Sequence, residues 1–124
     1  MKYDRKDDIE FIKLSRKLKI EANFTCQLCE RRGVELNVHH INSYDWDIPG
    51  RYDESNLIVL CKNHHEGFHQ IYGFGQNTEL QFQEYKEMIQ VLIKTAEHEM
   101  DKSLRVKSLI KMCLDDGYSD GYTA

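Results

Sequence analysis

The sequence has almost no proline, no long apolar segment and no internal repeat. One proline occurs in 124 residues, and no uninterrupted apolar run approaches the length of a membrane-spanning helix. Low-complexity segments are also missing. The chain is therefore expected to form one small domain with a modest core, which a bound structural metal would help to fold.

The sequence also has no excess of basic over acidic residues. The formal net charge is -4 at pH 7, which argues against a protein that coats nucleic acid by bulk attraction. The charge is uneven, however, because residues 1–35 carry nine Lys or Arg against seven acids, and residues 36–75 carry two against five. Local contacts with a polyanion are expected mainly in the N-terminal part, with a solvated surface as the alternative. The candidates are Arg16, Lys17, Lys19, Arg31, Arg32 and Arg51.

Four cysteines are present, and the chain begins with charged rather than apolar residues. This combination predicts a reducing compartment, by default the cytoplasm, where Cys-x-x-Cys indicates metal or redox chemistry. Cys26 and Cys29 have this spacing, and Cys61 and His64 repeat it downstream. The four residues together predict a zinc site with three thiolates and one imidazole. The βαβ pattern that a thioredoxin-like redox site requires is not found, and two unrelated buried pairs are the other alternative.

Hydrophobic periodicity and capping residues predict the elements. In chain order they are a helix over 7–22 capped by Asp7 or Asp8, strands over 34–40 and 57–60, a helix over 62–71, a long helix after Thr78 and a last helix over 102–115. The inward positions expected on the last two helices are Phe82, Tyr85, Ile89, Leu92, Ala96, Val106, Leu109, Ile110 and Cys113. In the loop over 42–55, Tyr44, Trp46 and Arg51 are candidates to stack on or clamp a substrate, with packing under the loop as the alternative.

Five of the six histidines lie in the middle of the chain. His39 and His40 end a predicted strand, and neighbouring strand residues point to opposite sides, so different roles are expected for them. On the predicted helix, His65 and His69 share one face at i and i+4, whereas His64 is rotated about 100° from His65. The helix can therefore supply His64 to the zinc site and the other two to a second metal site.

These motifs resemble the HNH endonuclease family with the ββα-metal fold, in its zinc-knuckle-stabilised form. The residues that carry the resemblance are Cys26-x-x-Cys29, His39-His40-Ile41, Asn56-Leu57, Leu60-Cys61-x-x-His64-His65 and His69. It covers about residues 22–75, and the run from Phe68 to Asn77 is similar to small phage-encoded and homing-type HNH enzymes. The resemblance implies an α+β fold with a nuclease core over 22–76, a basic helical segment over 1–21 and a helical extension over 77–124.

The resemblance also implies residue roles. His40 is expected to be the general base, and His65 to bind the catalytic metal. With His39 and His69, the site is similar to the colicin-type branch, in which three histidines hold the catalytic metal. Relatives usually have a cysteine in place of His64, and the imidazole keeps a zinc-competent ligand at this position.

Asn56, the middle Asn of the family motif, is expected to brace its loop through amide hydrogen bonds. The expected cofactors are a structural zinc ion and one catalytic divalent ion, Mg, Mn, Ni or Zn, with cobalt also suited to all-nitrogen ligation. The implied reaction is hydrolysis of phosphodiester bonds in DNA, expected to be double-stranded. His40 would activate water, and the metal would stabilise the phosphate and the leaving group.

Two other functions are compatible with parts of the sequence. His65-Glu66-x-x-His69 matches the zinc metalloprotease motif, with Glu66 as the base, but this leaves the His39-His40 pair, Asn56 and the cysteines unexplained. A zinc-stabilised module that binds nucleic acid or protein without catalysis explains the cysteines but leaves the surplus histidines without a role.

Overall fold

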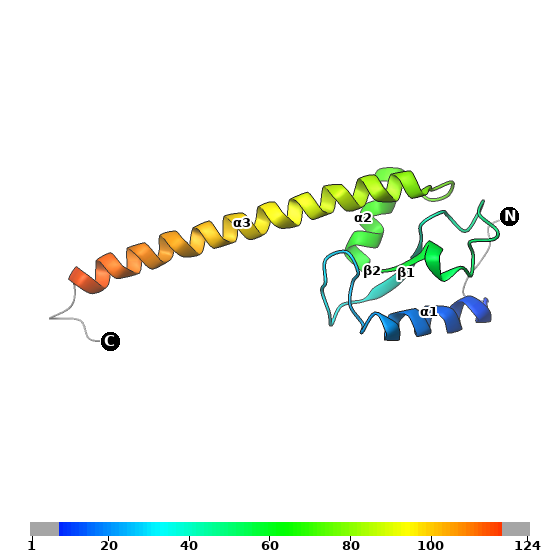
Figure 1. Ribbon diagram of the computed structural model, residues 1–124, viewed down its shortest axis with the longest axis horizontal. Helices are drawn as coiled ribbons and strands as arrows, with labels where there is room; N and C mark the ends of the chain where they lie inside the picture. Colours follow the sequence, from blue (N-terminus) through cyan, green and yellow to red (C-terminus); the bar gives the residue numbers. More distant parts are fainter. Residues whose placement is uncertain (1–7, 118–124) are drawn as a thin grey trace. The chain divides into compact units, whose positions relative to one another are not determined.

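The computed structural model describes residues 8–117, with side chains as far as Lys111. Its elements are helix α1 (Ile9–Glu21), strand β1 (Leu36–His40), a short 3-10 helix (Glu54–Asn56), strand β2 (Leu57–Cys61), helix α2 (Lys62–Tyr72) and helix α3 (Glu79–Gly117) (Figure 1). Contacts within the chain define two compact units, Met1–Gln90 and Val91–Ala124. None of the described helices is long and apolar enough to cross a membrane.

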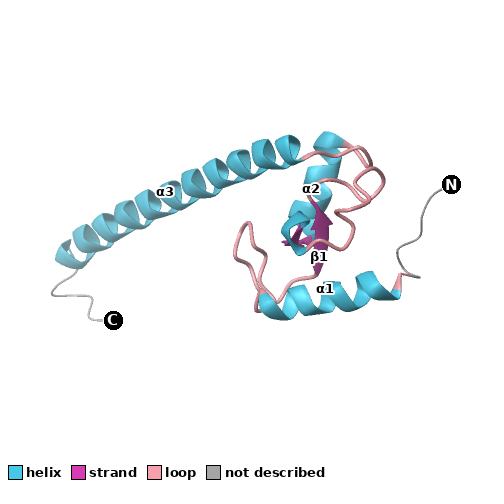
Figure 2. Cartoon of the chain, turned by 45° about the vertical axis from the view of Figure 1, so that its right-hand side comes forward, coloured by secondary structure: helices cyan, strands magenta, loops and turns pink. Residues whose placement is uncertain are grey.

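The sheet consists of β1 and β2, which pair antiparallel with Leu36 opposite Cys61 and His40 opposite Leu57. Helix α2 follows β2 directly, so the two strands and this helix form a ββα unit (Figure 2). The predicted α+β class is confirmed. The first strand begins at Leu36 rather than at the predicted Val34, because β2 ends at Cys61, the partner of Leu36.

Helix α1 covers one face of the sheet. Asp8 caps the helix, since its Oδ1 accepts a hydrogen bond from the backbone N–H of Phe11 at 3.1 Å. The partly buried side chains of Phe11, Leu14 and Leu18 pack against a cluster formed by Val38, Leu57 and Val59. The predicted N-terminal helix, its cap and its apolar stripe are therefore confirmed.

The other face of the sheet packs against α2 and the first turns of α3, and the buried residues there are Cys26, Leu28, Leu60, Cys61, Phe68, Phe82 and Tyr85. Helix α3 begins with the predicted capping box, in which the Gln81 N–H donates to Thr78 Oγ1 at 3.4 Å and the Thr78 N–H donates to Gln81 Oε1 at 3.2 Å. The Tyr85 hydroxyl donates to the His64 carbonyl at 2.9 Å. Gly67 makes room for this hydroxyl, because a Cβ there would lie 2.8 Å from it.

Two predictions for the C-terminal part are wrong. Helix α3 continues from Glu79 to Gly117, where the sequence predicts a separate helix over 102–115. No glycine or proline interrupts residues 79–116, and an ion pair of 3.0 Å between Arg105 and Asp101 spans the expected break. The side chains of the second unit that were expected to point inward are exposed, because this unit offers no other described element to cover them. They are Leu92, Ala96, Val106, Leu109 and Ile110; the side chain of Cys113 lies outside the described residues.

Candidate metal centres

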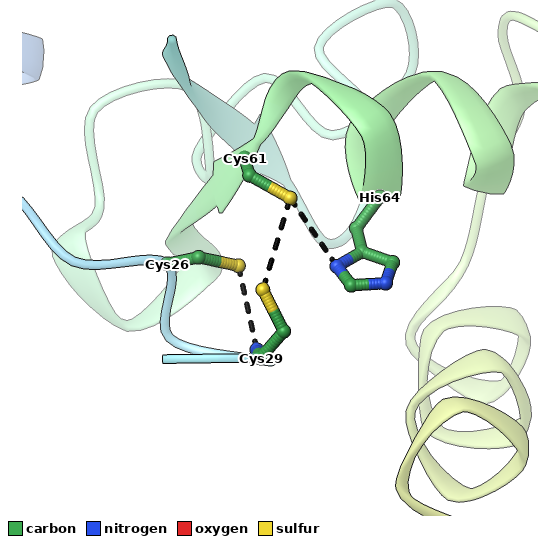
Figure 3. Close-up of side chains that lie close together, drawn as sticks. All are labelled: Cys26, Cys29, Cys61 and His64. Carbon is green, nitrogen blue, oxygen red and sulfur yellow. Dashed lines mark hydrogen bonds between the residues drawn. The ribbon is translucent and has the colours of Figure 1, made fainter. Parts of the chain in front are cut away.

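Three cysteines and one histidine from separate parts of the first unit converge at one end of the sheet. Cys26 and Cys29 lie in the turn after α1, Cys61 ends β2, and His64 lies in the first turn of α2. Their side chains point toward one another (Figure 3), and their ligand atoms all lie within 4.8 Å of each other. The four residues that were predicted from their repeated spacing to form one site therefore lie together in the structure.

The distances in this cluster fit a tetrahedral zinc ion. Zinc–sulfur bonds of about 2.3 Å place two sulfurs of one tetrahedron roughly 3.7 Å apart. Cys29 Sγ lies 3.9 Å from Cys61 Sγ, and Cys61 Sγ lies 3.3 Å from His64 Nδ1. Three sulfurs and one nitrogen fill all four positions of the tetrahedron, which is typical of a structural site.

Backbone contacts hold the Cys26–Cys29 turn in place against the sheet. The Cys29 N–H donates to Cys26 Sγ at 3.5 Å, and the Cys26 N–H donates to the Arg31 carbonyl at 2.9 Å. Gln27 forms two hydrogen bonds with the backbone of Val59 in β2. Its N–H donates to the Val59 carbonyl at 2.8 Å, and its Oε1 accepts from the Val59 N–H at 2.9 Å. The turn is thereby fixed to the strand that ends in the third cysteine.

The local electrostatics favour the metal-binding form of the histidine. Burial, and then the charge of Arg31, lower the pKa of His64, so its imidazole is neutral and can offer a lone pair. Burial raises the pKa of Cys61. Burial also acts to raise the pKa of Cys26, but backbone N–H groups, first that of Cys29, bring it below the usual value. A hydrogen bond to Cys29 raises the pKa of Arg31, which lies beside these sulfurs and offsets their charge.

A second cluster consists of His39 on β1 and of His65 and His69 on α2, with ligand atoms that all lie within 4.8 Å of one another. His65 Nε2 lies 3.2 Å from His69 Nε2. His69 Nδ1 lies 2.9 Å from the Gly73 carbonyl, which can only accept, so this nitrogen carries the proton and Nε2 faces the cluster. Gly73, at φ 81, ends α2 and presents this carbonyl.

The three imidazoles fit a divalent metal. Metal–nitrogen bonds of about 2.1 Å place two ligand nitrogens roughly 3.3 Å apart, close to the separation between His65 and His69. Three protein ligands leave coordination positions for water or substrate, which is typical of a catalytic site. The His39 ring is 2% exposed and packs edge-on against Phe68 at 4.6 Å, so the protein core fixes the orientation of this side chain.

His40 points to the opposite side of β1 from His39, as strand alternation predicts. Its ring stacks on Phe11 of α1 with centroids 5.0 Å apart and meets the edge of Tyr44 at 5.2 Å. His40 Nε2 lies 3.0 Å from the Arg51 carbonyl, which can only accept, so Nε2 carries a proton. The side chain is 3% exposed.

The Asn56 side chain braces the loop between the strands, in agreement with the sequence. Its Nδ2 donates to the carbonyl of Asn42 at 2.9 Å and to that of Gly50 at 3.0 Å. Its Oδ1 accepts from the Asn42 N–H at 2.8 Å. The fit is tight, because a Cβ on Gly50 would lie 2.7 Å from Asn56 Nδ2.

Four of the six basic candidates already contact other residues of the chain. Lys17 pairs with Glu54 at 2.9 Å, and Arg31 contacts Cys29. The other two contacts are a hydrogen bond of 3.4 Å from Arg32 to Asn23 Oδ1 and the guanidinium of Arg51 at 4.2 Å over the Tyr44 ring. Arg16 is exposed and Lys19 partly buried on α1.

Of the two aromatic candidates in the loop, Tyr44 follows the alternative of packing under the loop, and two contacts were not foreseen. Tyr44 is 6% exposed, and its hydroxyl donates to Asp8 Oδ2 at 3.1 Å, so it supports the loop and has little surface for a substrate. Asp8 acts beyond its capping role through this bond. Phe74, to which the sequence assigns no role, stacks on His69 with centroids 4.4 Å apart.

Comparison with protein families gives a match to the model described as HNH endonuclease, over residues 26–70. Neither a search of curated proteins nor a search of solved structures gave a match. The matched segment begins at the first residue of the cysteine cluster and includes both clusters, His40 and Asn56. The segment from residue 26 to residue 70 is therefore similar to the HNH endonuclease family.

Proposed function

We propose that this protein is a metal-dependent endonuclease that hydrolyses phosphodiester bonds in double-stranded DNA. The observation that carries the proposal is the cluster of His39, His65 and His69 inside the HNH match, with donor atoms within 4.8 Å of one another. Three neutral nitrogen donors can hold a divalent ion and leave positions for a phosphate oxygen and water.

A phosphodiester resists hydrolysis because its negative charge repels nucleophiles and its leaving oxygen is a poor leaving group. A divalent ion held by the three histidines supplies charge stabilisation to the phosphate and to the leaving oxygen. His40 is the proposed general base, since a neutral imidazole can take a proton from water near neutral pH. The hydrogen bond between Nε2 and the Arg51 carbonyl places a ring proton on Nε2, and the proposal assigns the accepting role to Nδ1.

The proposed cofactors follow from the two donor sets. Cys26, Cys29, Cys61 and His64 hold a structural zinc ion, and a reducing cytoplasm would keep the three thiols available to it. The three-histidine cluster holds one catalytic ion, which is Mg, Mn, Ni or Zn. In this proposal Asn56 acts through the loop that it braces. Arg16, Lys19 and the other basic candidates contact the DNA backbone.

The test replaces His40 with glutamine, whose side-chain N–H can still donate to the Arg51 carbonyl but cannot act as a base. We expect His40→Gln to lower the rate of plasmid nicking or cleavage by about 10²- to 10⁴-fold with added Mn, Ni or Mg. Its melting temperature and zinc content should equal those of the wild type. Full activity in this variant would exclude His40 as the base.

A second candidate function is a zinc-stabilised DNA-binding module without catalysis, and the 3% exposure of His40 favours it. In that case His40 serves only as a buried support between Phe11 and the Arg51 carbonyl. Tight DNA binding without cutting under any of the metals would support this module.

The metalloprotease reading is less well supported by the structure. The Glu66 carboxylate lies 3.9 Å from the ammonium of Lys62, and its side chain is 56% exposed. The residue grouped with the two helical histidines is His39. Peptide cleavage that is lost in Glu66→Ala would revive this reading.

A further inference from the structure

An exposed aromatic side chain lies directly against the three-histidine cluster. Phe74 is 84% exposed, and its ring is nearly parallel to that of His69, at 9° and with centroids 4.4 Å apart. One face of the phenyl ring therefore rests on a proposed metal ligand, and the other is open to solvent. A large apolar ring in this position gives up most of the stabilisation that burial would provide.

The segment that carries Phe74 is held in place by a second loop, so the ring has a rigid support. The Ser43 N–H donates to the Asn77 carbonyl at 3.0 Å, and the Asn77 N–H donates to Ser43 Oγ at 2.9 Å. The Gln76 N–H donates to the Asp45 carboxylate at 3.0 Å. Asn77 is fully buried, and its side chain donates to the Gly73 carbonyl at 3.2 Å. The positive φ values at Gly73 and Gly75, 81° and 96°, allow the tight path around Phe74.

The same pair of loops carries Trp46. Its indole N–H donates to the Asn77 carbonyl at 2.6 Å, and the residue is 47% exposed. The polar edge of the indole is thus satisfied by the protein while part of its ring surface stays open. Trp46 and Phe74 are fixed to one hydrogen-bonded frame, and we refer to these two side chains as the aromatic platform.

Basic side chains are few in the part of the sequence that forms this frame. Residues 36–75 contain Arg51 and Lys62 as their only Lys or Arg residues, against five carboxylates. One of these carboxylates, Asp45, belongs to the frame itself. Stacking on aromatic rings is the form of nucleic acid binding that does not depend on local positive charge, because every base has a π face.

We propose that the aromatic platform is a stacking subsite for a nucleobase that has left the base stack. Within a regular duplex both faces of a base are covered by its neighbours, so only an unpaired or extruded base can use such a subsite. The contact between Phe74 and His69 places this base next to the metal-binding cluster. That this base lies beside a cleaved phosphodiester bond rests on the proposed nuclease function. The preferred substrate is then duplex DNA with an unpaired nucleotide beside the scissile phosphate.

The chain offers a direct readout, because Trp46 is its only tryptophan. The experiment titrates the zinc-containing full-length His40→Gln protein, without added catalytic metal, with two duplexes that differ by one unpaired nucleotide. We expect the bulged duplex to quench the tryptophan fluorescence and to bind about tenfold more tightly than the regular duplex. In the same background, Phe74→Leu should lose this preference of about tenfold and bind the two duplexes with similar affinity. Phe74→Tyr should retain the preference.

Leu80→Ala is the matched control, since Leu80 is 83% exposed at the start of α3 and is not part of the platform. Its preference for the bulged duplex should be unchanged. Co²⁺ titration should show the same affinity of the histidine cluster in Phe74→Leu as in the parent protein, so that metal loss does not explain the result. Equal affinity of Phe74→Leu and its parent for the bulged duplex, or equal quenching by both duplexes, would overturn the subsite.

The results separate the subsite from the nuclease proposal. If the wild-type protein cuts no DNA but shows a fluorescence change that depends on Phe74, the subsite is supported and the nuclease function fails. If the wild type cuts regular and bulged duplexes equally and Phe74→Leu does the same, the subsite fails and the nuclease function stands.

Discussion

The two clusters of potential metal ligands share helix α2 but differ in chemistry and in closure. The first combines three sulfurs with one nitrogen, whereas the second offers three nitrogens. The first draws its ligands from a turn, a strand end and the start of a helix, and it completes a tetrahedron. The second leaves positions free. A site that joins distant parts of the chain is suited to stabilise the fold, and a site with open positions is suited to bind a substrate.

The difference between the clusters depends on helical geometry. His64 and His65 are adjacent in sequence but are rotated by about 100° around the axis of α2, so they serve different clusters. The support around each site also differs. Arg31 lies beside the sulfurs of the first cluster, while aromatic rings such as Phe68 surround the histidines of the second. Neighbouring residues can thus have separate effects on stability and on activity.

The largest expected effect tests the first cluster. Cys26→Ser should lose zinc and fail to fold at room temperature, because a structural zinc site contributes about 10 kcal/mol, as much as the whole stability of a typical small domain. Zinc analysis and circular dichroism measure this. Cys113→Ser makes the same chemical change elsewhere in the chain and should fold with its full zinc content. A folded Cys26→Ser protein with unchanged zinc would refute the structural assignment.

The next effect tests the second cluster. His65→Ala should reduce cleavage of plasmid DNA by at least about 100-fold. Replacing a residue that only hydrogen-bonds to a metal ligand already lowers metal affinity or activity by about 10- to 100-fold, and loss of the ligand itself should have at least as large an effect. The fold and the zinc bound by the cysteine cluster should persist. His98→Ala, a change at an exposed histidine of α3, serves as the control and should cleave normally. If His65→Ala instead lost its structural zinc, the two clusters would not be independent.

A smaller effect is expected in the loop between the strands. Asn56→Ala removes three hydrogen bonds to buried or partly buried backbone groups and should lower the free energy of unfolding by about 3 kcal/mol. Urea denaturation measures the loss, and both clusters should keep their metal affinity. Asn63→Ala, on the exposed side of α2, should change stability little. A stability equal to that of the wild type would show that these bonds do not brace the loop.

The smallest effect concerns the surface outside both clusters. Lys17→Gln should leave the thermal stability unchanged, because the ion pair with Glu54 is exposed and screened by water. If Lys17 contacts a DNA phosphate, the slope of log affinity against log salt concentration should fall by about one. Lys13→Gln, on the same helix, is the control with an unchanged slope. An unchanged slope in Lys17→Gln would remove this residue from the proposed DNA interface.

Much of the candidate site could be predicted because its spacing is local. Cys26 and Cys29 lie in one turn, and His65 and His69 lie one turn apart on one helix, so geometry within a few residues fixes their relation. The pairing of β1 with β2 then brings His39 to α2. The capping residues Asp8 and Thr78 were predictable for the same reason, since each acts on backbone groups three residues away.

What could not be predicted depends on contacts between distant segments. The burial of Tyr44 results from the Asp8 carboxylate, 36 positions away in sequence. The position of Phe74 depends on its loop pairing with the loop around Ser43. The prediction for the part of α3 after Gln90 is wrong for another reason. Leu92 and Val106 fit an amphipathic pattern, but both residues are exposed. An amphipathic pattern predicts which side chains share a helix face, and it does not predict whether another surface covers that face.

Helix α2 is a fixed length of chain between two clusters of candidate metal ligands, because His64 belongs to one cluster and His65 and His69 belong to the other. Inserting or deleting one residue between His64 and His69 would rotate the rest of the helix by about 100° and carry one set of ligands away from its partners. The loop over residues 42–50 has no such requirement at its exposed tip, where Ile48 is 65% exposed. Variation in chain length is therefore expected to collect at that tip and to be absent from α2.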